Sequence, residues 1–182
     1  MDPSRHTAAE VNFVAENAIL DIIPSFKLEG LHLITKSYGP FQPQRTTQVP
    51  LWLALELKSS KRCQIVCPSW MTVENLKLAS QRELENETSW EKMHPAYLEV
   101  SMALLCNAAD DIQSPSEVRL LLNTIWDARF AKIKKQLHHL EADSIMVRLT
   151  NLTMMEINRT RQFVTEAMFE FQELDDCDNQ ER

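Results

Sequence analysis

Apolar residues in the first part of the chain form short runs that prolines and glycines separate. Thr7 and Glu10 have the spacing of a capping box, which predicts the start of a helix. Residues 19–23 and 28–34 are short apolar stretches, and we expect both to be strands. Residues 38–43 contain a glycine followed by a proline and predict a turn, so this part of the chain should be mixed α/β.

The run from Val49 to Lys58 allows two interpretations. Its apolar character suits a buried strand, but Pro50 suits the first position of a helix, where its missing N–H costs nothing. Apolar residues then recur three and four positions apart, and we therefore favour a short helix. Residues 63–67 follow as a predicted strand that ends at Pro68.

From residue 69 onward, apolar residues recur at helical spacing and prolines become rare. Thr72, Pro95 and Pro115 each predict the start of a helix, Thr72 as a cap and the prolines as first residues. The third of these helices carries an apolar stripe of about five turns that extends to Leu137. A last helix is expected over residues 163–171.

These patterns predict an α+β fold that is predominantly α, with a small β-containing N-terminal module followed by a helical bundle domain. Six of the eight prolines and both glycines lie in residues 1–68, which carry seven basic and six acidic residues. The rest of the chain carries twelve basic and twenty acidic residues. We place the mixed module at 1–68, the helical domain at 69–174, and an acidic tail, expected to be disordered, at 175–182.

Composition excludes several classes of function. The chain has 182 residues, a net charge of −7 and only two glycines, Gly30 and Gly39. A dinucleotide-binding turn or a phosphate-binding loop needs glycines close together, so neither site is expected. The negative charge argues against a protein that coats nucleic acid. No stretch of about 18 apolar residues and no signal-peptide run is present, so we expect an intracellular protein without a membrane partner.

The residues that most often carry chemistry do not form a recognisable site. Cys63 and Cys67 are spaced like half of a metal site, but no second pair with suitable spacing accompanies them. We expect both to be reduced and buried, and we expect Cys106 to pack in the core because it lies on an apolar stripe. Paired acids lie in charged segments, which are typical of a solvated surface. We therefore predict no enzyme activity, no metal and no cofactor.

One basic cluster supports an alternative function. Arg129, Lys132, Lys134 and Lys135 lie close together near the end of the long predicted helix. These cations suit an independent nucleic-acid-binding module that contacts phosphates through the segment Arg129–Lys135. The competing interpretation is a helix end where basic residues interact favourably with the helix dipole.

The four tryptophans fall into two groups. Trp52 and Trp126 lie in strongly apolar segments, and we expect both in the core. Trp70 and Trp90 lie near predicted element boundaries and are candidate interface anchors. The helical part presents more apolar surface than four helices of this size easily bury, so a subunit of an obligate assembly is a natural explanation, although burial in a monomeric bundle remains open.

Several motifs, in this order, resemble a known family over roughly residues 9–174. They are Gly-Pro-Phe at 39–41, Val-Pro-Leu-Trp-Leu-Ala-Leu-Glu-Leu-Lys at 49–58, Pro-Ser-Trp-Met at 68–71, Trp-Asp-x-Arg-x-Ala-Lys at 126–132 and Asn-Leu-Thr-x-Met-Glu-Ile-Asn at 151–158. The chain resembles the Psf-two family of subunits of the eukaryotic GINS replication complex. The resemblance implies a β-containing module joined to a helical domain.

The resemblance also implies a function and partners. Family members are non-catalytic subunits of a nuclear heterotetramer with three paralogous GINS subunits. That complex braces the MCM motor ring and its RecJ-like accessory protein in the replicative DNA helicase. Direct DNA contact has only weak support.

Arg129 is the first candidate for a structural or interface role within these motifs, with Asp127 and Glu156 as candidate acceptors of its hydrogen bonds. On this basis Arg129→Glu is expected to weaken assembly more than it changes the isolated fold. Further candidate interface or structural residues are Trp126, Leu152, Met155, Trp70, Trp52 and Pro50.

Overall fold

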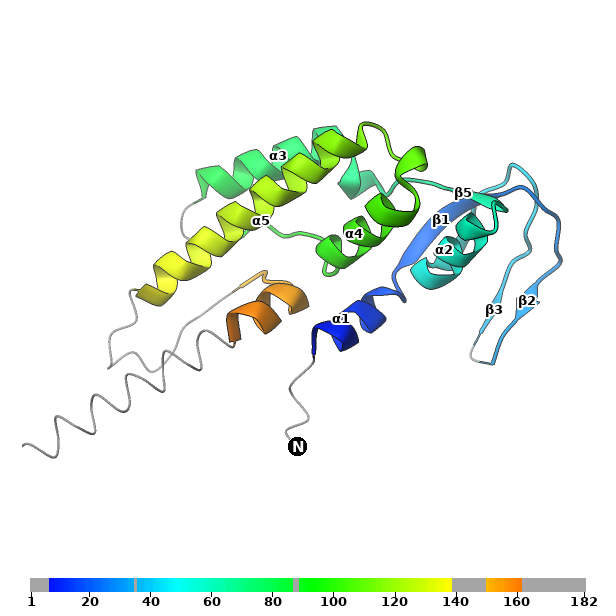
Figure 1. Ribbon diagram of the computed structural model, residues 1–182, viewed down its shortest axis with the longest axis horizontal. Helices are drawn as coiled ribbons and strands as arrows, with labels where there is room; N and C mark the ends of the chain where they lie inside the picture. Colours follow the sequence, from blue (N-terminus) through cyan, green and yellow to red (C-terminus); the bar gives the residue numbers. More distant parts are fainter. Residues whose placement is uncertain (1–6, 35, 87–88, 139–149, 162–182) are drawn as a thin grey trace, which may run out of the picture.

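A computed structural model describes residues 7–34, 36–86, 89–138 and 150–161, with only the backbone at 136–138. A small sheet and its short helices occupy one end of the molecule, and longer helices occupy the rest (Figure 1). This confirms the predicted α+β fold with helices predominant. The helix expected at 163–171 and the acidic tail lie outside the described residues.

Helix α1 (Ala8–Ala15) begins at the predicted capping box. The Thr7 backbone N–H donates to Glu10 Oε2 at 2.6 Å, and the Glu10 backbone N–H donates to Thr7 Oγ1 at 3.3 Å. These two bonds satisfy donors that the first turn of a helix leaves without a partner. Val11 and Ala15 are buried, whereas Val14 is 57% exposed.

The sheet has three antiparallel strands in the order β4-β1-β5. The central strand β1 (Ile19–Pro24) pairs with β4 (Thr47–Pro50) on one side and with β5 (Cys63–Ile65) on the other. Alternate side chains of β1 are buried, as expected of a strand with one face on the core. The sequence analysis predicted β1 and β5 and missed β4.

Strands β2 (Leu31–His32) and β3 (Ser37–Tyr38) form a separate two-residue ladder. The strand expected over 28–34 is therefore much shorter, because only Leu31 and His32 pair with β3. Part of the turn expected at 38–43 belongs to β3. Gly39 has a φ of +122°, and a Cβ there would lie 3.1 Å from the Cα of Gly30. Both the backbone conformation and the close approach to Gly30 therefore favour glycine at position 39.

Helix α2 (Leu51–Ser59) confirms the helical interpretation of residues 49–58. Pro50 was expected as the first helical residue. It is instead the N-cap and the last residue of β4, so the helix begins one residue later, at Leu51. Trp52 is 37% exposed and lies edge-on to Tyr38 at 6.4 Å between ring centroids. The prediction that Trp52 is a core residue is therefore wrong, because α2 directs Leu51, Leu53 and Ala54 inward instead.

The remaining chain is helical. The 3-10 turn η1 (Ser69–Met71) leads to α3 (Val73–Glu85), whose cap is Thr72 as predicted. Helix α4 (Tyr97–Asn107) begins two residues after Pro95, because Ala96 has φ −119° and ψ 40°, outside the helical range, and is the N-cap. The turn η2 (Ala109–Asp111) precedes α5 (Pro115–His138), which begins at the predicted proline. Residues 154–161 are also helical.

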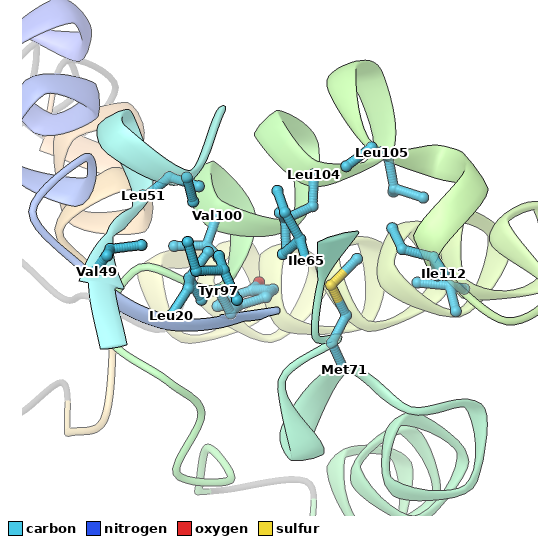
Figure 2. Close-up of a cluster of buried hydrophobic side chains, with 14 of the residues drawn as sticks. Leu20, Val49, Leu51, Ile65, Met71, Tyr97, Val100, Leu104, Leu105 and Ile112 are labelled. Carbon is cyan, nitrogen blue, oxygen red and sulfur yellow. The ribbon is translucent and has the colours of Figure 1, made fainter. Parts of the chain in front are cut away.

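One hydrophobic core joins the sheet to the helices (Figure 2). It includes Ile22 of β1, Val49 of β4, Met71 of η1 and Leu104 of α4, each at most 1% exposed. Asp111 adds a polar connection, because its Oδ2 accepts from the Ile65 backbone N–H at 2.8 Å and contacts Lys58 Nζ at 2.7 Å. The core therefore crosses residue 68, where we drew the boundary between the two domains.

Candidate functional site: the Arg129 cluster

Arg129 lies on the buried stripe of α5. Val118, Leu122, Ile125 and Ile133 occupy the same face at intervals of three or four residues, and each is at most 4% exposed. Arg129 falls within this series and is itself 0% exposed. A charged side chain on an apolar stripe needs partners in the interior, and this spacing was visible in the sequence.

All five N–H donors of the Arg129 guanidinium are used. Nε donates to Glu156 Oε1 at 2.6 Å and Nη2 donates to Glu156 Oε2 at 3.0 Å, which makes a two-bond ion pair. Nη1 donates to Glu83 Oε2 and to the Glu91 carbonyl, both at 3.0 Å. Nη2 also donates to the Asn151 carbonyl at 2.8 Å. This saturation fixes the side chain in one orientation.

Glu156 also begins the helical segment 154–161. Its Oε2 accepts from the Thr153 backbone N–H at 2.8 Å, while its own N–H donates to Thr153 Oγ1 at 3.4 Å. This is a second capping box, and the same carboxylate serves both the helix start and the ion pair. Tyr97 of α4 donates its hydroxyl hydrogen to Glu156 Oε1 at 3.0 Å.

Glu83 of α3 holds a second cation. Lys132 Nζ lies 2.8 Å from Glu83 Oε1 and donates to the Ser89 carbonyl at 3.2 Å. Glu83 Oε2 also accepts from the Glu91 backbone N–H at 2.9 Å. The Arg129 cluster, defined as Arg129, Glu83, Glu156, Lys132 and Tyr97, therefore balances two cations with two carboxylates.

The cluster joins separate parts of the chain. It connects α3, the segment at 89–91, α4, α5 and residues 151–156. Asn151, with a φ of 61°, donates from its side chain to the Trp90 carbonyl at 3.0 Å. Such a network holds elements in position but leaves no free base, acid or nucleophile to act on a substrate.

The environment keeps Arg129 charged and Tyr97 protonated. Burial lowers the pKa of Arg129, but the Glu156 and Glu83 carboxylates outweigh this, so its pKa is raised overall. Burial and then the nearby Glu156 charge raise the pKa of Tyr97, which keeps its hydroxyl protonated as a donor. The cluster therefore acts as a fixed structural pairing at neutral pH.

The sequence analysis left two candidate acceptors for Arg129. Glu156 accepts two of its hydrogen bonds, whereas Asp127 is exposed and is absent from the described contacts of Arg129. The burial of Arg129 also changes the expectation for Arg129→Glu. A carboxylate here would face Glu83 and Glu156, so the isolated fold should lose stability first. The sequence analysis missed Glu83 and Lys132 as members of this network.

The other candidate residues lie around the cluster. Trp126 is half-buried rather than fully in the core, and it stacks on Phe130 at 6.0 Å between ring centroids. Trp70 is half-buried and stacks on His94 at 5.2 Å. Trp90 is 3% exposed, so it is a buried residue rather than the interface anchor we expected.

Leu152 and Met155 flank the second capping box. Both are half-buried, and Met155 lines a pocket between helices. Pro50, the remaining candidate, is buried between β4 and α2. These three residues thus pack within the chain, and the structure leaves part of Leu152 and Met155 accessible.

The basic segment that suggested nucleic-acid binding loses two of its cations to the interior. Arg129 is fully buried and Lys132 pairs with Glu83. Lys134 is exposed and lies over the Phe130 ring at 4.9 Å from its centroid. The remaining positive surface in this segment is small, which makes it a weak site for phosphates.

The described cysteines differ in accessibility. Cys63 is buried and Cys67 is half-buried, whereas Cys106 is exposed, so the prediction that Cys106 packs in the core is wrong. Cys106 lies on α4 and lines a pocket between helices. Within the described residues, no group of three or more His, Cys, Asp or Glu could hold a metal ion, and no helix there is long and apolar enough to cross a membrane.

Thiol labelling tests this assignment. Burial raises the pKa of Cys63 to about 11, so little of this thiol is ionised at pH 8. Among the three cysteines that the structure describes, we expect a thiol-specific reagent at that pH to modify Cys106 first and Cys63 last under native conditions, as measured by mass spectrometry of peptides. Labelling of Cys63 as fast as Cys106 would contradict the burial. Cys106→Ser, which removes the exposed thiol, is the control.

Comparison with known proteins agrees with this architecture. The PSF2 N-terminal domain model matches residues 7–66, and the GINS complex protein helical bundle domain model matches residues 70–172. The chain is 40% identical over 167 residues to the human "DNA replication complex GINS protein PSF2", covering 88% of each chain. It is 41% identical to the Xenopus laevis protein of that name, with the same coverage. The Schizosaccharomyces pombe protein is 36% identical over 159 residues, covering 87% of this chain and 85% of that protein.

Both parts of the chain thus match in the expected order, and the relatives are matched over nearly their whole length. The buried residues of the Arg129 cluster lie within the helical bundle match. From the two domain matches and the identity to these relatives, the chain belongs to the PSF2 family of DNA replication complex GINS proteins.

Proposed function

We propose that this chain is a non-catalytic subunit of a four-subunit GINS complex in the nucleus. It binds three paralogous subunits, and the complex braces the MCM motor ring and its RecJ-like accessory protein in the replicative helicase. The observation that carries this proposal is a set of large apolar side chains left on the surface of the helical part. Leu78 and Leu84 of α3, Met102 of α4 and Leu120 of α5 are between 50% and 65% exposed.

These exposed side chains suit subunit contacts. Burying the exposed part of each one on assembly would contribute about 1–2 kcal/mol, since each is already partly buried in the isolated chain. Obligate interfaces are more apolar than ordinary protein surfaces for this reason. The Arg129 cluster complements this role, because it holds α3, α4 and α5 in fixed positions behind the exposed faces. A brace needs such rigidity and needs no reactive group.

Co-expression of the full chain with three GINS paralogues tests the proposal. We expect one species with one copy of each subunit in size-exclusion chromatography with light scattering. Leu84→Glu should reduce the yield of this species without lowering the melting temperature of the chain alone, because Leu84 is exposed. Lys134→Glu, an exposed charge change on α5, is the control and should assemble normally.

Two results would contradict this function. A stable monomer that does not bind the paralogues would exclude the subunit role. Tight binding to single-stranded DNA with a steep dependence on salt, lost in Lys134→Glu, would favour the nucleic-acid alternative instead.

A further inference from the structure

Glu99 of α4 is a buried carboxylate without a hydrogen-bond partner among the described residues. The residue is 8% exposed, and neither Oε1 nor Oε2 has a hydrogen-bond partner in the described part of the chain. Burial raises the pKa of Glu99, its own backbone N–H lowers the pKa by a smaller amount, and the charge of Glu156 adds a further, still smaller rise. Leaving such a group unpaired is costly, and native proteins nearly always satisfy buried polar atoms.

Glu99 lies in the wall of a pocket of about 610 Å³ between α1, α4, α5 and residues 154–161. The pocket is mostly apolar, with Leu98, Met102, Trp126 and Met155 among its lining residues. Met102 is 62% exposed, so the pocket is continuous with an apolar surface of α4. Glu99 also lines a second pocket of about 290 Å³ on the other side of α1.

The chemistry of the site selects its ligand. A guanidinium group satisfies both oxygens of a carboxylate at once through two parallel hydrogen bonds, and its aliphatic stem suits apolar walls. Within this chain, Arg129 already makes that pairing with Glu156 and has no donor left. Arg159 lines the same pocket, but it is exposed and its Cζ lies over the Trp126 ring at 6.0 Å from the centroid.

We propose that this pocket receives an arginine side chain of a sister GINS subunit, which forms a two-bond ion pair with Glu99. The arginine enters past Met102, its stem contacts the apolar lining, and its charge neutralises the buried carboxylate. The proposal rests on the proposed function, since it assigns one contact of the same assembly. It explains why the isolated chain keeps an unpaired charge where an apolar residue would be more stable.

Glu99→Gln tests this contact in the full chain, alone and with the three paralogues. Gln has the same shape without the charge, so the melting temperature of the chain alone should stay the same or rise. The dissociation constant for joining the other three subunits should increase roughly thirtyfold or more, because removing one charge of a buried ion pair typically weakens binding by at least this factor. Glu74→Gln, on the exposed surface of α3, should change neither quantity.

A pH series adds a readout that a simple packing role would not give. The raised pKa of Glu99 means that the folded chain holds this proton more tightly than the unfolded chain, so wild-type stability should fall relative to Glu99→Gln as the pH rises above the ordinary glutamate range. Glu16 and Arg159 on the pocket, His94 on the second pocket and nearby Glu156 are common to both proteins, so the difference isolates Glu99.

The outcomes separate the two proposals. If the wild-type chain does not join the paralogues, the proposed function fails. If it joins and Glu99→Gln joins equally well, only the arginine contact is overturned. A lower melting temperature in both Glu99→Gln and Arg159→Gln would show a pair within the chain and would also overturn it. Glu99→Met, which suits the apolar lining, provides a second variant and should weaken assembly in the same way.

Discussion

Arg129→Met is expected to lower the free energy of unfolding by about 3–5 kcal/mol, as is typical when one partner of a buried ion pair is removed. Met keeps much of the volume but none of the five hydrogen bonds. Glu156 then loses its cation, and the carbonyls of Glu91 and Asn151 lose their donor. Urea unfolding followed by circular dichroism measures the loss, in the chain alone or in the assembled complex.

A matched control lies one turn further along the same helix. Lys134→Met removes an exposed cation that lies over the face of Phe130, and should cost less than about 1 kcal/mol. Equal stability of Arg129→Met and wild type at neutral pH would show that the cluster is dispensable.

Glu156→Ala is expected to have a comparable effect, about 3–5 kcal/mol, because one carboxylate serves three contacts. It pairs with Arg129, accepts from Tyr97 and caps the helical segment 154–161 through Thr153. Glu156→Gln keeps an oxygen acceptor but loses the charge, so its deficit should be smaller. Thr153→Ala, which removes only the reciprocal cap bond, should cost about 1 kcal/mol.

A double-mutant cycle distinguishes a pairwise effect from two independent ones. The variant with both Arg129→Met and Glu156→Met should be less destabilised than the sum of the single changes, by about 0.5–3 kcal/mol, since each single change strands a charge. The same urea denaturation series provides all four values. Additive losses would mean that Arg129 and Glu156 stabilise the fold separately, in conflict with their two-bond contact.

Local signals in the sequence identified most element types and several boundaries. The capping box at Thr7 and Glu10, the cap at Thr72 and the start of α5 at Pro115 were all predicted. Each depends on contacts within one helical turn, so neighbouring residues are sufficient to define it. The start of α4 was placed two residues early, because Ala96, which follows Pro95, has a non-helical backbone and is the N-cap.

Strand pairing was harder to predict from the sequence than helix starts. Strand β4 has only four residues and runs directly into α2, so it was not predicted. The strand predicted over 28–34 has only two paired residues in the structure. Pairing depends on which distant segment lies next to a strand. Strand β1 pairs with β4 and β5, which both follow the β2–β3 ladder in the sequence. The predicted burial of Trp52 and Cys106 was also wrong, because their helices turn other side chains toward the core.

By itself, the sequence determined the helical caps, the order of a β-containing part before a helical part, and the motifs that the family shares. Only the tertiary structure decided what Arg129 does. Its carboxylate partners lie 46 and 27 residues away along the chain, and five donors find five acceptors only when three helices and two connecting segments meet. The lack of a partner for Glu99 is likewise a property of the packed molecule. Burial and hydrogen-bond satisfaction depend on distances that the order of residues does not contain.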